Sequence, residues 1–299
     1  MGCSKKTPPS SNSNAGPPST TAATPSASPV ASAGDKGLKG SAGGSDGEPS
    51  SGALVAGEVV IKSHDLPPAN RPVAEFTPAA SGFKFQNYGN DKGYTNLTIT
   101  EVRRMFGDQV CASTEGGNCV LTPVAAQWIE GSNKSMGGGH CEGFAALALL
   151  MERGQIDPKL FGADGAGKLD VDGNEKLQRE IAYWFVTQGV PPMSTAEDKS
   201  LTPAQVEEKL AASFKGDLKA ETFTLGLYAP GYKMGHATTP YAVIEKPDDV
   251  AWIMHYDNNY PGEEKSVVVD KKTNKWTYTT AADPAAGEHA YEEMLPPRH

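Results

Sequence analysis

The chain has 299 residues, a formal net charge of −9 and four cysteines. An acidic chain in which no cluster of Lys and Arg alternates with aromatic residues is not expected to bind nucleic acid. The sequence also contains no apolar run of eighteen or more residues, so it predicts no helix that spans a membrane.

The N-terminal segment differs in composition from the rest of the chain. From Ser4 to about Gly52 it consists almost entirely of Ser, Pro, Ala, Gly and Thr. Such a segment cannot bury enough apolar surface to offset the entropy lost on ordering it. We therefore expect a disordered tether at residues 1–52, followed by one folded domain at 53–299 that holds all the Trp, Phe and Tyr residues.

A cysteine at position 3 begins this tether. A Cys at the head of a Ser/Pro/Ala/Gly-rich segment resembles a mature bacterial lipoprotein, in which Cys3 would carry lipid, although no hydrophobic signal precedes it here. Myristoylation of Gly2 with palmitoylation of Cys3 is an alternative that Lys6 disfavours, and an unmodified soluble tail is another. We expect a lipid-anchored protein on the bacterial cell envelope, outside the cytoplasm, with the bilayer as a partner.

Two further cysteines, Cys111 and Cys119, enclose a short loop that contains Gly-Gly. Such a loop can close like a hairpin and bring the two Cα atoms within disulfide distance. A disulfide persists outside the reducing cytosol, in agreement with the lipoprotein hypothesis. Both thiols could instead be free, whereas a zinc site is disfavoured because no His lies nearby. We expect the disulfide.

The first part of the folded domain is expected to contain extended segments and two helices. Each helix begins at a residue that can cap it, and in the second helix Pro occupies the first position. The predicted elements are extended segments at 58–62 and 83–88, a helix at 100–107 with a capping box of Thr98 and Glu101, and a helix at 122–130 with Val124, Trp128 and Ile129 facing inward.

The central segment carries the candidate nucleophile. The run from Cys141 to Met151 is apolar on every side, and a helix of that kind lies inside a protein. The glycines at 137–139 cannot easily extend this helix backwards, so Cys141 should lie at its N-terminus. There the unpaired backbone N–H groups and the helix dipole favour a thiolate. A buried structural cysteine is the alternative.

The rest of the domain changes from helices to strands. We expect helices at 175–188 and 202–214, separated by a mobile loop at 191–201. The acidic stretch at 164–174 should be a turn rather than a calcium site, because Glu175 stands where an EF-hand requires Gly. Strands are predicted at 222–228, 236–245, 250–257, 266–270 and 276–280, with hairpin turns at 246–249 and 271–274. Helices followed by an antiparallel sheet define an α+β domain.

A partner for Cys141 is predicted on this sheet. If the strands at 236–245 and 250–257 pair, His236 and Asp257 should lie about level, so that the carboxylate fixes the orientation of the imidazole. Zinc is an alternative for this region, but a metal needs at least three converging ligands, so we expect no metal or other cofactor. The candidate zinc ligands are His140, Cys141, His236, His255 and Asp257.

These residues, in the order Cys, His, Asp, resemble the papain-like cysteine peptidase superfamily. The turn at 257–262, Asp-Asn-Asn-Tyr-Pro-Gly, is similar to the Asp-Pro-Asn-x-Pro-Gly turn of bacteriocin-leader peptidases. The resemblance covers roughly residues 83–280 and implies a papain-like fold, with the Cys-bearing helix packed on a C-terminal antiparallel sheet. It implies that Cys141 is the nucleophile, His236 the general base and acid, and Asp257 the residue that orients His236.

The sequence departs from this family at the oxyanion site. Papain-like enzymes have a Gln a few residues before the Cys, and Ser135 and Gly137 occupy that interval here. We expect the backbone N–H of Cys141 to bind the oxyanion. Residues that could also bind it or support the site are Asn133, Gln127, Gly139, His140 and Asn258.

The function expected from the resemblance is thiol-dependent acyl transfer. With water as acceptor the protein would be a cysteine peptidase or amidase that acts on a peptide or protein. With an amine as acceptor it would be a transglutaminase-like ligase. A catalytically inactive, surface-tethered binding protein is the alternative from a different class.

Overall fold

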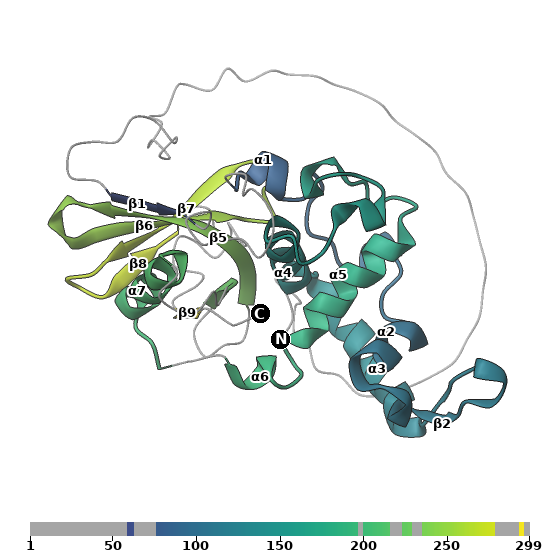
Figure 1. Ribbon diagram of the computed structural model, residues 1–299. Helices are drawn as coiled ribbons and strands as arrows, with labels where there is room; N and C mark the ends of the chain where they lie inside the picture. The colour runs from purple at the N-terminus through teal and green to yellow at the C-terminus, as the bar shows by residue number, and fades with distance from the viewer. Residues whose placement is uncertain are drawn as a thin grey trace, which may run out of the picture.

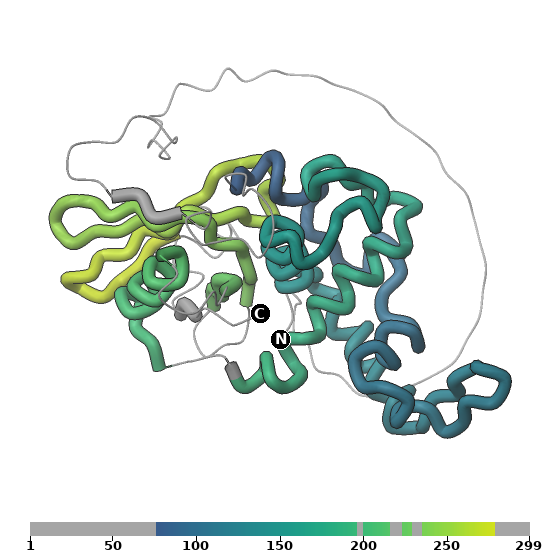
Figure 2. The backbone as a smooth tube through the Cα atoms, in the orientation of Figure 1, coloured from purple at the N-terminus to yellow at the C-terminus, as the bar shows by residue number. Residues whose placement is uncertain are grey.

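The computed structural model describes residues 59–62, 76–196, 200–215, 223–228, 235–278 and 293–295. The predicted tether at 1–52, including Cys3, lies outside these ranges. Helices dominate the first part of the described chain and strands the last part, as expected for an α+β protein. Figure 1 shows the helices and the sheet side by side, and the tube in Figure 2 follows the chain from one half to the other.

The helical half is built mainly from four helices: α2 (Ile99–Phe106), α3 (Pro123–Ser135), α4 (Cys141–Glu152) and α5 (Glu175–Thr187). The predicted capping box is confirmed, since the Thr98 and Glu101 side chains both bond across the first turn of α2. Helix α4 lies between the other helices and the sheet (Figure 1). The smaller elements are α1 (Pro78–Ser81), the hairpin of β2 (Cys111–Ser113) and β3 (Val120–Leu121), and short 3-10 turns.

Three predictions in this half were wrong. Helix α3 continues to Ser135 instead of ending near residue 130, and Val124 is 78% exposed rather than buried. Ala125 occupies the inward position of that first turn, because neighbouring helical residues point about 100° apart. The predicted loop at 191–201 contains a short helix, α6 (Met193–Ala196). Residues 83–88, predicted as an extended segment, form an arm without helix or strand.

Helix α4 is buried along its whole length, as its all-round apolar sequence predicts. Its contact with α5 depends on Gly143, because a Cβ atom at that position would lie 2.0 Å from the carbonyl oxygen of Ile181. The absence of a side chain lets the two helix backbones approach each other closely. On another side of α4, Phe144 packs against the rings of Phe83, Phe85 and Tyr88.

The sheet is antiparallel throughout its described pairings, in the order β8-β7-β6-β5-β4-β9, and β1 also pairs with β5. Strand β4 pairs with the first part of β5 and β1 pairs with the last part, so the long strand β5 has two neighbours on one side. The strands are β1 (Val59–Lys62), β4 (Leu225–Tyr228), β5 (Gly235–Lys246), β6 (Val250–Tyr256), β7 (Glu264–Asp270), β8 (Lys275–Thr277) and β9 (Glu293–Leu295).

The two faces of the sheet pack against different helices. Side chains alternate along a strand, so Ile253 of β6 joins the apolar cluster of helix α7 (Pro203–Phe214), while Met254 joins the cluster of α4 and α5. The capping box predicted for α7, between Thr202 and Gln205, is also confirmed. None of the helices in the described ranges is both long enough and apolar enough to cross a bilayer.

Candidate active site

Cys141 is the first residue of α4, as predicted from the glycines before it. Those glycines form the end of a 3-10 turn, η5 (Met136–Gly138), and Gly139 has φ 130°, a conformation that favours glycine. His140 is the N-cap, but its side chain makes no capping hydrogen bond to the first turn. Cys141 is 4% exposed and therefore lies inside the protein at the positive end of a buried helix.

The structure brings together the predicted His and Asp. His236 is the second residue of β5 and Asp257 follows the end of β6, and the distance between His236 Nε2 and Asp257 Oδ1 is 2.7 Å. The predicted register is wrong in detail. A bulge lies between Pro240 and Ala242, and Thr239 pairs with Tyr256. The two side chains therefore meet diagonally, beyond the last pair of the ladder.

Three donors hold the carboxylate of Asp257. Besides His236, the backbone N–H of Asn259 donates to Oδ1 at 2.8 Å, and the Tyr278 hydroxyl donates to Oδ2. Burial alone would raise the pKa of Asp257, but the charge of His236 and the hydrogen bonds from His236 and Tyr278 outweigh it and lower this pKa to about 2. Asp257 is therefore ionised at neutral pH.

This carboxylate sets the tautomer of His236. With Asp257 ionised, Nε2 of the ring carries the proton, and Nδ1 is left as the basic nitrogen. Nδ1 is buried and has no hydrogen-bond partner in the described part of the chain. His255 has two such nitrogens, but the His236 ring is the one that the ionised Asp257 carboxylate holds by a hydrogen bond. Nδ1 of the His236 ring is the atom of this site that can accept and return a proton.

Asn258 connects the helix to the strand. Its Nδ2 donates to the carbonyl oxygen of Cys141 at 3.1 Å and to that of Ala237 at 2.8 Å. One side-chain nitrogen thus joins the start of α4 to the residue after His236. Cys141 and Ala237 also belong to the same apolar cluster. The start of α4 and the start of β5 are therefore neighbours, and Cys141, His236 and Asp257 lie in one region.

A second connection, the arm at residues 86–88, was not predicted from the sequence. Asn87 donates its backbone N–H to Asn258 O at 2.7 Å, and its Oδ1 accepts the backbone N–H of His140 at 2.8 Å. Gln86 Nε2 donates to Asn259 O at 2.9 Å. This arm therefore ties the N-terminus of α4 to the turn that carries Asp257. Two adjacent amide side chains in a Phe-rich segment are the only sequence signal for it.

The cysteines are oxidised in the structure. Cys111 and Cys119 form the predicted disulfide, with their Cα atoms 5.2 Å apart, across the β2–β3 hairpin. Cys141 is also disulfide-bonded. Because only a thiolate attacks a carbonyl carbon, Cys141 must be reduced before it can act as a nucleophile.

The other predicted oxyanion residues are engaged elsewhere. The side-chain amide of Asn133 accepts from the backbone N–H of Leu97 at 3.1 Å and donates to Leu97 O at 3.0 Å. Gln127 is exposed on α3. Asn133 thus holds the segment before α2 instead of presenting its amide to a substrate. The backbone N–H groups at the start of α4 remain as candidate oxyanion donors.

The geometry gives no support to the zinc alternative. The described ranges contain no group of three or more His, Cys, Asp or Glu side chains placed to hold a metal ion. Burial lowers the pKa of His255 to about 4, so its ring is neutral, and it packs against Tyr278 with ring centroids 5.0 Å apart. His255 therefore belongs to the packing around Asp257.

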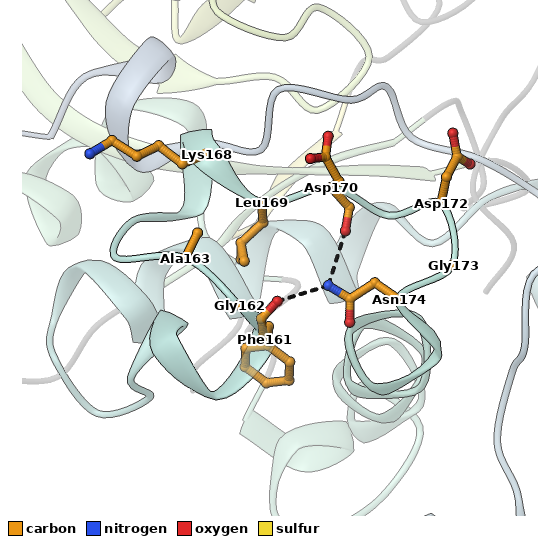
Figure 3. Close-up of a pocket in the computed structure, with 9 residues that line it drawn as sticks. All are labelled: Phe161, Gly162, Ala163, Lys168, Leu169, Asp170, Asp172, Gly173 and Asn174. Carbon is orange, nitrogen blue, oxygen red and sulfur yellow. Dashed lines mark hydrogen bonds between the residues drawn. The ribbon is translucent and has the colours of Figure 1, made fainter.

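The acidic stretch forms the predicted turn before a helix. A pocket of about 320 Å³ lies along it, and Figure 3 shows Asn174 in that pocket, donating to the carbonyl oxygens of Phe161 and Asp170. Asn174 also caps α5 through Leu177 N–H. Asp170 pairs with Lys84, and Asp172 accepts from Tyr94. Neighbouring side chains thus engage both acids.

Protein-family models, curated proteins and solved structures give no match to this chain. The fold and the site define an α+β protein with a Cys, a His and an Asp gathered where a buried helix begins beside a sheet. The assignment of function rests on this site.

Proposed function

We propose that the protein is a papain-like cysteine hydrolase, a peptidase or amidase. Cys141 is the nucleophile, His236 the general base and acid, and Asp257 the residue that orients His236. The observation that carries the proposal is the 2.7 Å contact from His236 Nε2 to Asp257, which leaves the buried Nδ1 of His236 as the basic nitrogen. The packing of the Cys-bearing helix on an antiparallel sheet supports a papain-like fold.

The first step forms an acyl-enzyme from the reduced protein. The thiolate of Cys141, favoured by the N-terminus of α4, attacks the carbonyl carbon of the substrate and forms a C–S bond. Backbone N–H groups at the start of α4, which the His140 side chain does not cap, stabilise the oxyanion. The C–N bond then breaks, and His236 gives the proton on Nδ1 to the leaving amine.

The second step releases the acyl group. His236 Nδ1 accepts a proton from water, whose oxygen attacks the acyl carbon, and the C–S bond breaks. The products are a carboxylic acid and the Cys141 thiolate beside a protonated His236. If an amine replaces water, the same residues transfer the acyl group to nitrogen, which is the ligase alternative.

A small pocket offers space for part of a peptide or protein substrate. It has a volume of about 110 Å³, lies at the C-terminal ends of α3 and α5, and is lined in part by Phe185 and Val186. Both residues pack in the same apolar cluster as Cys141. A pocket lined by both apolar and polar groups, two of which share a cluster with the nucleophile, suits one amino-acid side chain. Its polar lining residues are Ser132, Ser135 and Gln188.

We also propose that the enzyme works outside the cytoplasm, as a lipoprotein tethered through Cys3 and residues 1–52. The Cys111–Cys119 disulfide supports this location, because disulfides persist in oxidising compartments.

The proposal is tested with a thiol-reactive activity probe on gently reduced protein. Peptide mapping separates the labelling of Cys141 from that of Cys111 and Cys119. We expect His236→Ala to slow labelling of Cys141 by about a hundredfold, the usual contribution of a general base. The control variant Asn118→Ala changes an exposed side chain of the disulfide loop and should label like the wild type. Equal labelling of all three proteins would contradict the proposal.

A tethered binding protein that has lost activity is the second candidate. The engagement of Asn133 with Leu97 at the expected oxyanion site favours it. In that case reduced Cys141 should alkylate with the midpoint of an ordinary thiol, at about pH 8.5. A midpoint well below that value would favour the enzyme.

A further inference from the structure

The ring of His140, which is 1% exposed, lies between two hydrogen-bond acceptors. Nδ1 is 2.7 Å from the backbone carbonyl oxygen of Tyr88. A carbonyl oxygen only accepts, so Nδ1 must carry a proton. On the other side, Nε2 is 2.8 Å from Oδ1 of Asn96. The charge of the ring depends on whether that second contact also requires a donor from His140.

The orientation of Asn96 is set by a chain of amides that leads away from His140. Asn96 Nδ2 donates to Asn90 Oδ1 at 2.8 Å, and Asn90 Nδ2 donates to the backbone carbonyl oxygen of Asn133 at 2.9 Å. Because Asn133 O can only accept, Asn90 must present its NH₂ group there and its oxygen to Asn96. Asn96 must then present its NH₂ group to Asn90 and its oxygen to His140.

A count of donors fixes the protonation of His140. This chain of hydrogen bonds runs from Tyr88 O through His140, Asn96 and Asn90 to Asn133 O and contains four hydrogen bonds. Three side chains lie between these carbonyls, and each of them, when neutral, donates along the chain only once. Rotation of either amide moves the unsatisfied contact to another position without removing it. The imidazole is the only group in the chain that can bind another proton. We infer that His140 is held as an imidazolium, protonated on both ring nitrogens, directly before Cys141.

Two aromatic rings flank the ring of His140. The rings of Tyr88 and Phe185 have centroids 4.7 and 5.8 Å from the His140 ring, within the range of cation–π attraction. Tyr88 is also a titratable neighbour of this ring, and Cys141 follows His140 in the chain. Burial raises the pKa of Tyr88, so it stays a neutral phenol. The two flanking rings thus attract a charged His140 and carry no charge of their own.

The role of His140 toward Cys141 rests on the proposed function, whereas the charge of His140 does not. A fixed cation on the residue directly before Cys141 lowers the pKa of the Cys141 thiol, because a nearby positive charge favours the thiolate. His140 is thus a positioning residue: it favours the reactive thiolate but contacts no substrate. Its effect adds to that of the α4 dipole, which acts on the same sulfur.

NMR of reduced protein labelled with ¹⁵N-histidine measures the charge directly. The His140 signals are assigned by their loss in His140→Gln. We expect both ring nitrogens of His140 to be protonated at pH 7.5 in the wild type. In Asn90→Ala the chain no longer ends at Asn133 O, so Asn96 can turn and donate to Nε2, and the ring becomes neutral with its proton on Nδ1. The control Asn118→Ala should match the wild type.

The result that would overturn the inference is a neutral His140 in the wild type, a measurement that needs no folded variant. A charged ring that persists in Asn90→Ala would also overturn it, because the donor count would then not be the cause.

The pH profile of Cys141 alkylation tests the role. Loss of the charge in Asn90→Ala should reduce the alkylation rate at pH 6 by about tenfold, the effect of one pKa unit, and leave the plateau at high pH unchanged. An unchanged profile would overturn the role. If His140 is charged but His236→Ala labels like the wild type, the proposed function fails and the charge stands. If His140 is neutral but labelling depends on His236, the inference about His140 fails and the proposed function stands.

Discussion

The helical half and the sheet half of the molecule are held together in different ways. In the helical half, α4 is buried against apolar and aromatic side chains, and its close contact with α5 is possible because Gly143 has no side chain. Buried ionisable side chains lie in both halves, but those with a pKa shifted to between about 2 and 7 belong to the sheet half: His255, Asp257 and Glu207. Stability should therefore respond mainly to side-chain volume in the first half and to pH in the second.

The candidate site lies where these two kinds of interior meet. Helix α4 contributes a nucleophile and a dipole. Both arise within one buried helix and require no partner from another part of the chain. The sheet contributes the proton carrier, which needs a charged partner held in a fixed place. The following predictions test this contrast, from the largest expected effect to the smallest.

The largest effect is expected for Asp257→Asn. The amide keeps the shape of the side chain but cannot hold the proton of His236 on Nε2, so the probe should react with Cys141 about 10³-fold more slowly or worse. Rates of labelling measured on reduced protein check this expectation. Asp108→Asn, at an exposed site paired with Arg103, is the control. If the two variants react equally fast, Asp257 has no part in activation.

The next effect concerns packing in the helical half. Gly143→Ala would place a Cβ atom 2.0 Å from the carbonyl oxygen of Ile181 and should lower the free energy of unfolding by about 3 kcal/mol or more. Gly131 of α3 is the matched control: a Cβ atom there meets nothing within 4 Å, so Gly131→Ala should raise stability by up to about 1 kcal/mol. Urea unfolding of both variants measures the contrast. A similar effect of both would show that α4 and α5 do not pack this closely.

Acid should destabilise the sheet half through His255. Burial lowers its pKa from 6.5 to about 4, so the unfolded chain binds a proton that the folded protein excludes. The stability from this group is fully present above pH 6.5 and is lost as the pH falls towards 4, by about 3 kcal/mol. His255→Phe should flatten the curve of unfolding free energy in that range. Asp257, with its pKa lowered to about 2, contributes a separate loss below pH 3.8.

The smallest effect has the opposite sign and comes from Glu207 on α7. Burial and the nearby Glu245 outweigh Lys271 and raise the pKa of Glu207 to about 7. Stability from this group is therefore fully present below pH 4.5 and is lost as the pH rises through 7. The loss is about 2 kcal/mol, less than the full shift would give, because Glu245 and Lys271 are partly exposed and solvent screens their interaction with Glu207. Glu207→Gln should remove this slope from the pH dependence of unfolding. The neighbouring exposed residue offers a control, and Glu208→Gln should leave the slope unchanged.

Local signals in the sequence predicted most of the elements. The capping residues Thr98, Thr122 and Thr202 mark the starts of three helices, because their side chains satisfy N–H groups that the helix itself leaves unpaired. The glycines before Cys141 placed it at the start of α4 for a similar local reason. The direction of Val124 was mispredicted, since an apolar residue in a first turn can face either solvent or core.

The candidate site was only partly predictable. The contact between His236 and Asp257 was predicted from the turn between their strands, but the bulge at Pro240 changes the register, and no local rule locates it. Asn87, Asn96 and Tyr278 were missed altogether. Each is far in sequence from the residue that it contacts, so no short pattern links them.

The sequence by itself determined that a buried helix begins at Cys141 and that strands with a His and an Asp follow, because helix caps, glycines and alternating apolar residues act over a few positions. Only the tertiary structure decided which amides surround these groups. The arm at 86–88 and the chain from Tyr88 to Asn133 exist because folding brings distant backbone carbonyls to the start of α4. The protonation of His236 follows from its contact with Asp257, and that of His140 from the chain of amides. In both cases a buried ring takes the protons that its neighbours can accept.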